Sequence, residues 1–217
     1  HVLYLYSKKQ LKSHNESDIK ISFLIENLKD FGNSLDLLNV GLTIIETDGF
    51  SSDSEEVIKF FENNNFDKLF FNNTFGVDES NRDFEIIKLL EDKRYEYEHF
   101  DDQILFKPGS IQTNEGKPYS VFTPFKRKWL EFFNIDLLDI EYAYSAKKKK
   151  FLDSNINNFD FSHDYTFDSN LWKVGEKGAK YVLDDFLKLK ASYYHKNRND
   201  PIKEGTSRIS PYLALGV

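Results

Sequence analysis

A short polar stretch near residue 205 contains the residue types best suited to bind a charged ligand. It runs Glu204-Gly205-Thr206-Ser207-Arg208-Ile209-Ser210-Pro211, and its proline suits the first turn of a following helix. Backbone N–H groups and hydroxyls that converge at such a turn, with an arginine nearby, favour the oxygens of a phosphate group. Taken alone, such a run before a proline-started helix more often forms a plain helix cap, so the pattern by itself does not establish a phosphate site.

Two further groups of residues have the chemistry of a binding site. Tyr194 lies twelve residues before the run of hydroxyls, in a stretch that combines aromatic and basic side chains as far as Arg198. On their own, Tyr194 would be a partly buried core residue and Arg198 a surface charge. Asp78 and Glu79 follow the apolar run at residues 68–71, at the strand end where open α/β sheets bind ligands. As plain structure, these two acids would belong to the first turn of a helix.

The elements that must position these residues alternate over the first hundred positions. Short apolar or β-branched runs predict strands at residues 2–6, 41–47, 68–71 and 95–100. Helical spacing predicts a helix whose apolar stripe ends at Phe31, a second capped by Ser54, and a third over residues 80–92 with Phe84 on its apolar side. Such alternation with short connections predicts an α/β fold, in which helices flank a parallel sheet.

Composition excludes several classes of protein and of site. With no cysteine among 217 residues, a disulfide scaffold, a zinc-thiolate site, an iron–sulfur cluster and a cysteine nucleophile are all excluded. No metal site is predicted. The formal charge of −7 gives no global attraction to nucleic acid, although a local basic groove stays possible. No apolar run is long enough to span a membrane, so we expect no membrane contact. With no cysteine and no stretch that reads as a signal peptide, we expect a cytoplasmic protein.

The polar stretch together with Tyr212 and Leu213, and with Gly216 after it, closely resembles the flavin-phosphate motif of DNA photolyases and cryptochromes. Nearly the whole chain resembles this family, most of all its class I members that act on cyclobutane pyrimidine dimers. Three more blocks resemble the family in the same order: Phe100-Asp101-Asp102 through Pro108-Gly109, Val121-Phe122-Thr123-Pro124-Phe125-Lys126 through Trp129, and Gly175-Glu176 through Ala179.

This resemblance implies a domain organisation. Residues 1–103 would form a Rossmann-like antenna domain, residues 104–170 a long linker, and residues 171–217 the start of an all-helical FAD-binding domain. The chain contains no methionine, and we expect it to be a piece of a longer protein that lacks the family's first strand and most of the flavin domain. We therefore expect residues 1–217 alone to be inactive and to bind flavin weakly at best.

The resemblance also implies roles for individual residues. No catalytic side chain is expected in the chain, because the cofactor carries the chemistry. The antenna chromophore would be methenyltetrahydrofolate or a flavin, and its identity stays open because Asp78 replaces a more usual asparagine. The implied contacts are Tyr194, Thr206, Ser207, Arg208, Ile209 and Ser210 with FAD, Arg198 with DNA, and Asp78 and Glu79 with the antenna chromophore.

Two functions follow from the resemblance and one does not depend on it. The first is light-driven repair of cyclobutane pyrimidine dimers by electron transfer from reduced FAD, in a monomer whose partner is damaged DNA. The second is a cryptochrome, a blue-light photoreceptor with the same fold and flavin. The third is a soluble α/β module whose Thr206–Ser210 run is merely a helix cap.

Overall fold

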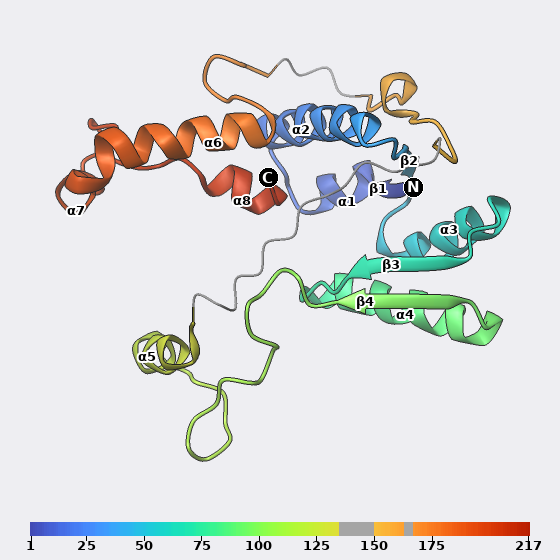
Figure 1. Ribbon diagram of the computed structural model, residues 1–217, viewed down its shortest axis with the longest axis horizontal. Coiled ribbons are helices and arrows are strands. Elements are labelled where there is room, and N and C mark those ends of the chain that lie inside the picture. Colours follow the sequence, from blue (N-terminus) through green and yellow to red (C-terminus); the bar gives the residue numbers. More distant parts are fainter. Residues whose placement is uncertain (135–149, 163–166) are drawn as a thin grey trace. The chain divides into compact units, whose positions relative to one another are not determined.

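The computed structural model describes residues 1–134, 150–162 and 167–217, so parts of the predicted linker lie outside the described residues (Figure 1). The chain divides into two compact units. Unit 1 contains His1–Glu46 and Tyr144–Val217, and unit 2 contains Thr47–Ala143. The elements in chain order are β1 Val2–Tyr6, α1 Lys8–Ser13, α2 Asp18–Leu37, β2 Leu42–Glu46, α3 Phe50–Asn63, β3 Lys68–Asn72, α4 Val77–Lys93, β4 Glu96–Phe100, α5 Phe122–Phe132, η2 Ile156–Asn158, α6 Gly175–Asp185, η3 Phe186–Lys190, η4 Ala191–Tyr193, α7 Tyr194–Asn197 and α8 Ser210–Leu215.

Strand pairing is parallel in both units, as the alternation of strands and helices predicts. In unit 1, β1 pairs with β2, and Val2 lies opposite Leu42. In unit 2, β3 pairs with β4, and Lys68 lies opposite Glu96. The α/β fold class is therefore confirmed. The described strands form two sheets of two strands each, however, where the sequence predicts a single sheet.

The edge of β2 that does not face β1 is occupied by the segment Ser154–Asn155. The Asn155 side chain accepts a hydrogen bond from the Ile44 N–H at 2.8 Å and donates one to the Ile44 carbonyl at 2.9 Å. The Ser154 hydroxyl accepts from the Leu42 N–H at 3.0 Å, and the Asn155 N–H donates to the Leu42 carbonyl at 3.0 Å. With β1 on one edge and Ser154–Asn155 on the other, β2 has no free edge for a further strand.

A carboxylate at the end of α2 fixes this closing segment. Lys150 Nζ and the Ser154 hydroxyl both donate to Asp36 Oδ1, at 2.8 and 2.6 Å. These two hydrogen bonds, above all the one from Lys150, lower the pKa of the Asp36 carboxyl below its ordinary value. The segment that closes the sheet edge is therefore attached to α2 by a charge-assisted pair.

Replacing Asp36 is expected to produce a stability loss that depends on pH. A carboxyl whose pKa is depressed on folding stabilises the folded state at neutral pH, and this contribution is lost as the pH falls below about 4. The Asp36→Asn variant should therefore be less stable than the wild type in urea at pH 7, with a difference that shrinks towards pH 3. Glu26→Gln, which removes an exposed carboxylate of the same helix, is the control. A difference that is the same at every pH would contradict the role of this charge.

Helix α2 is the centre of unit 1. It begins after Ser17, whose hydroxyl accepts a hydrogen bond from the Lys20 N–H. The prediction that Phe31 ends the apolar stripe of this helix is wrong, because Phe31 is 46% exposed. Phe23, which lies outside the predicted stripe, is buried. The helix packs on two sides, so its buried residues do not lie on a single stripe. One cluster joins it to the strands and the closing segment, through Tyr6, Ile25, Leu28, Leu35, Leu42, Ile44, Ile156 and Phe161.

The helices of unit 2 start earlier than the sequence predicts. Helix α3 begins after Gly49, so Ser54 lies buried inside the helix and is not its cap. Gly49 has φ 99° and ψ −167°, a conformation that only glycine adopts without strain, and it turns the chain directly from strand to helix. Helix α4 likewise starts at Val77, and Phe84 is 64% exposed. Its buried side consists of Asp83, Ile86 and Leu90.

None of the helices in the described ranges is both long and apolar enough to cross a membrane.

Candidate functional site

Tyr194 lies at the start of α7, and two other side chains hold its ring. The ring of Phe186 meets it edge to face, with centroids 5.8 Å apart and an interplanar angle of 87°. The guanidinium carbon of Arg198 lies 5.7 Å from the centre of the same ring, within the range of a cation–π contact. Tyr194 is still 39% exposed, so part of its ring is available to a ligand.

The predicted phosphate-binding run lies next to α7 because of one glycine. A Cβ atom on Gly205 would lie 2.6 Å from the Cβ of Asn197 and 2.9 Å from both the carbonyl carbon and oxygen of that residue. Only a residue without a side chain allows the loop to approach the end of α7 this closely. The structure thereby brings Thr206–Ser210 near the segment that starts at Tyr194, as a shared ligand would require.

The side chains of this loop leave hydroxyls available for a ligand. Thr206 and Ser210 are exposed, and neither hydroxyl makes a hydrogen bond to any part of the chain that the structure describes. The Ser207 hydroxyl accepts from the Ile209 N–H at 3.4 Å. Arg208 has a left-handed backbone, with φ 54°, and its guanidinium donates to Glu204 at 3.3 Å. This exposed pair is weak, so an anion could readily displace Glu204 from the arginine.

A buried tyrosine anchors the end of the loop. Tyr212 lies in α8 with 0% of its surface exposed, and its hydroxyl donates to the Lys173 carbonyl at 2.7 Å. Its ring packs edge to face on Phe23 of α2, with centroids 5.3 Å apart. Trp172 also packs on Phe23, at 6.1 Å. The candidate flavin residues therefore stand on a core that α2 shares with α6 and α8.

The start of α6 is attached to the same helix by a buried amide. The Asn27 side chain donates to the Phe23 carbonyl at 2.7 Å, and its oxygen accepts from the Gly175 N–H at 2.8 Å. Gly175 has φ 74°, and a side chain there would collide with the carboxylate of Asp30. This hydrogen bond and this close approach fix where the helix that leads to Tyr194 begins.

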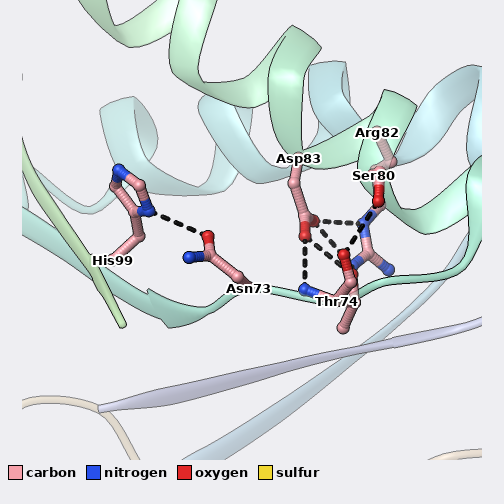
Figure 2. A network of polar contacts seen from close by, with 6 residues as sticks. All are labelled: Asn73, Thr74, Ser80, Arg82, Asp83 and His99. Carbon is pink, nitrogen blue, oxygen red and sulfur yellow. Dashed lines mark hydrogen bonds and ion pairs between the residues drawn. The ribbon is translucent and has the colours of Figure 1, made fainter. Parts of the chain in front are cut away.

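The second candidate site lies at the corner between β3 and α4 in unit 2 (Figure 2). The buried carboxylate of Asp83 accepts hydrogen bonds from the Thr74 hydroxyl at 2.7 Å, from the Thr74 N–H at 3.3 Å and from Arg82 Nη2 at 2.7 Å. The Ser80 hydroxyl donates to the Thr74 carbonyl at 2.8 Å. On the strand side, Asn73 Oδ1 and His99 Nδ1 lie 2.8 Å apart. Polar contacts thus fix this loop on both sides (Figure 2).

Asp78 and Glu79 both lie in the first turn of α4, where carboxylates interact favourably with the helix dipole. Asp78 is exposed, whereas Glu79 is half-buried and its carboxylate covers Gly76, the N-cap residue. These acids belong to unit 2, and the candidate flavin residues belong to unit 1.

Sequence reasoning missed the residues that fix the corner, namely Arg82 and Asp83. A signal for Asp83 was present, because it lies on the same helical side as Ile86 and Leu90, three and seven residues later. An acid on an apolar stripe needs a partner when it is buried, and here the partners are Thr74 and Arg82. Within residues 1–134, 150–162 and 167–217, no group of three or more His, Asp or Glu side chains could hold a metal ion.

Comparison with known proteins finds a family whose sequence model matches most of the chain. Residues 1–147 match the family model described as DNA photolyase. Proteins named deoxyribodipyrimidine photo-lyase from Vibrio cholerae and Escherichia coli are each 29% identical to the chain, over 217 and 214 residues, and each alignment covers 99% of it. The mitochondrial protein of that name from Saccharomyces cerevisiae is 26% identical over 237 aligned positions. The chain spans about half the length of these relatives, from 42% to 46%.

Solved structures show the same fold. A class III photolyase from Agrobacterium tumefaciens superposes with a TM-score of 0.72 at 24% identity, over 99% of this chain and 44% of that one. An archaeal photolyase from Sulfolobus tokodaii, described with two FAD molecules, superposes with a TM-score of 0.68 at 18% identity, over 99% and 45%. Because both sequence identities are low, these superpositions show a shared fold and nothing further.

Proposed function

Because the chain belongs to the DNA photolyase family, we propose that the complete protein repairs cyclobutane pyrimidine dimers in DNA, using light and FAD. The observation that carries the proposal is the packing of Gly205 against Asn197. This contact holds the exposed hydroxyls of Thr206 and Ser210 near Tyr194. A ligand that carries both phosphate groups and an aromatic ring system could contact both groups, and FAD, whose diphosphate links a flavin to an adenosine, has this composition.

The residues of the chain would bind and orient the flavin. Phosphate oxygens would accept hydrogen bonds from the Thr206 and Ser210 hydroxyls and from the backbone N–H groups between them. Arg208 would leave Glu204 and pair with the phosphate instead. Tyr194, held by Phe186, would pack against the cofactor. Ser207 and Ile209 would complete the phosphate-binding run. When bound in its reduced form, FAD would supply the light-driven electron that splits the dimer.

Arg198 is the proposed contact with DNA in this chain. It is exposed, and its guanidinium can bind a DNA phosphate while it stacks on Tyr194. The damaged bases would be flipped out of the duplex, which costs less for a poorly stacked dimer than for normal bases. The net charge of −7 does not oppose this proposal, because contact with phosphates depends on local basic residues.

We propose that Asp78 and Glu79 bind an antenna chromophore, either methenyltetrahydrofolate or a flavin. Their carboxylates can accept hydrogen bonds from the N–H groups of a pterin or flavin ring, and the contacts of Asp83 fix the loop that precedes them. The division into an antenna domain at 1–103, a linker at 104–170 and a flavin domain from 171 is part of the same proposal. A cytoplasmic monomer likewise stays a prediction.

The test uses the complete protein and DNA that contains pyrimidine dimers. We expect dimers to disappear under blue light and not in the dark, and Thr206→Ala/Ser210→Ala to weaken FAD binding about tenfold or more. Ser192→Ala, which removes an exposed hydroxyl elsewhere in the same segment, should have no effect. If dimers survive while the bound flavin is photoreduced, the protein is a photoreceptor of the cryptochrome type. If no flavin binds, the Thr206–Ser210 run is only a helix cap.

A further inference from the structure

The segment that carries Tyr194 is not a continuous α-helix. Helix α6 passes into a π-helical turn, η3, then into a 3-10 turn, η4, and finally into α7; Figure 1 shows these as one orange ribbon from α6 to α7. The backbone leaves helical values at Lys190, with φ −124° and ψ −28°, and again at Tyr193, with φ −104° and ψ 3°. Isolated π turns are rare, and many of those known lie at functional sites.

An ion pair spans the π turn and depends on the geometry of that turn. Lys190 Nζ lies 2.6 Å from Asp185 Oδ2, and both side chains are partly buried. Residues five apart in an α-helix point about 140° away from each other, so this pair would not form there. A π turn has more residues per turn and joins residues i and i+5 by a backbone hydrogen bond, and the Ala191 N–H accordingly donates to the Phe186 carbonyl. The Asp185–Lys190 pair therefore stabilises the π turn over an α turn.

The consequence of the turn is a contact between two aromatic rings. Phe186 and Tyr194 are eight residues apart, which corresponds to about 12 Å along the axis of an uninterrupted α-helix. Here their ring centroids are only 5.8 Å apart. The wide turn and the break after it shorten this separation. Phe186 is half-buried, so it is fixed more firmly than the exposed Tyr194 that it contacts.

We propose that the π turn Phe186–Lys190, closed by the Asp185–Lys190 pair, positions Tyr194 for the flavin by holding Phe186 against its ring. Phe186 is thus a positioning residue that acts through Tyr194. This inference rests on the proposed function, because it assumes that Tyr194 contacts FAD. It adds that the geometry of that contact is set by residues that need not touch the cofactor themselves.

The test measures FAD affinity and thermal unfolding in the complete protein. Phe186→Leu should weaken FAD binding about five- to tenfold through loss of the ring contact. Phe186→Tyr, which keeps a ring, should bind FAD as the wild type does. Asp185→Asn should weaken binding about threefold, because a partly exposed pair contributes modestly. The matched control is Asp184→Asn, which breaks the neighbouring pair with Lys180 at ordinary i,i+4 spacing and should leave the affinity unchanged.

A double-mutant cycle with Tyr194→Ala separates positioning from general stability. If Phe186 acts through Tyr194, Phe186→Leu should cause no further loss of affinity once Tyr194 is alanine. If the two losses instead multiply, or if Asp184→Asn weakens binding as much as Asp185→Asn, the inference is wrong. Thermal unfolding identifies any variant that loses affinity because it fails to fold. If the wild-type protein binds no FAD, or Tyr194→Ala binds it normally, the proposed function or its tyrosine contact fails instead.

Discussion

The Gly205→Ala variant of the complete protein is expected to bind FAD about 5- to 150-fold more weakly than the wild type. The added methyl group would lie 2.6 Å from the Asn197 Cβ and 2.9 Å from the Asn197 carbonyl atoms. Backbone atoms cannot swing aside as the end of a flexible side chain can, so the loop must move. Overpacking of this kind costs about 1–3 kcal/mol, which corresponds to the stated range of affinity.

The reason for so large an effect from one methyl group is geometric. Gly205 does not have positive φ in this structure, so alanine is not strained there by its own backbone. The loss should come only from separating the phosphate-binding run from Tyr194, and isothermal titration with FAD measures it. Lys203→Ala, in the same exposed loop, should bind FAD normally. Asn197→Gly combined with Gly205→Ala should recover part of the affinity, since it removes one of the colliding atoms. Wild-type affinity in Gly205→Ala would show that the packing is unimportant.

Tyr212→Ala is expected to reduce the free energy of unfolding by about 3–5 kcal/mol, as for other large aromatic side chains removed from a core. Tyr212 has no exposed surface and packs against Phe23, which joins α8 to α2. Its loss would leave a cavity between these helices and release the loop that α8 anchors. Urea denaturation of the complete protein at pH 7 measures the change.

Tyr212→Phe separates the hydrogen bond from the packing. The ring would stay in place and only the bond to the Lys173 carbonyl would be lost, so we expect a cost of about 0.5–1.5 kcal/mol. Burial raises the pKa of the Tyr212 phenol above its ordinary value of 10.0, so the hydroxyl stays a donor throughout the neutral range. Equal losses in the phenylalanine and alanine variants would mean that the hydrogen bond, and not the packed ring, holds α8 in place.

The sequence predicts those features that depend on neighbouring residues. The strand at Val2–Tyr6 has the predicted bounds, because a short apolar and aromatic run is sufficient to indicate a strand. Helix starts were less accurate. The residue that precedes α3 as its N-cap is Gly49, which acts through its backbone conformation. Ser54 is a residue type that often caps helices, but it lies inside this one.

The features that the sequence does not predict are contacts between distant residues. Nothing local in Ser154–Asn155 indicates that this segment closes the edge of β2, over a hundred positions earlier. The candidate flavin residues can be identified from their resemblance to a family, but the packing of Gly205 on Asn197 that brings them together cannot. The Asp185–Lys190 pair is similarly hidden, because five-residue spacing has no meaning until a π turn is known to be present.

The closing of β2 by Asn155 has a consequence for the protein during its synthesis. The two residues that form this contact are separated by 111 positions. At about 5–20 residues per second, a ribosome needs roughly 5–20 s to add the residues that lie between them. Throughout that time the β2 edge of a nascent chain is open, and such an edge can pair with another chain. The asparagine that completes the sheet thus also ends a period in which the growing chain is exposed to aggregation.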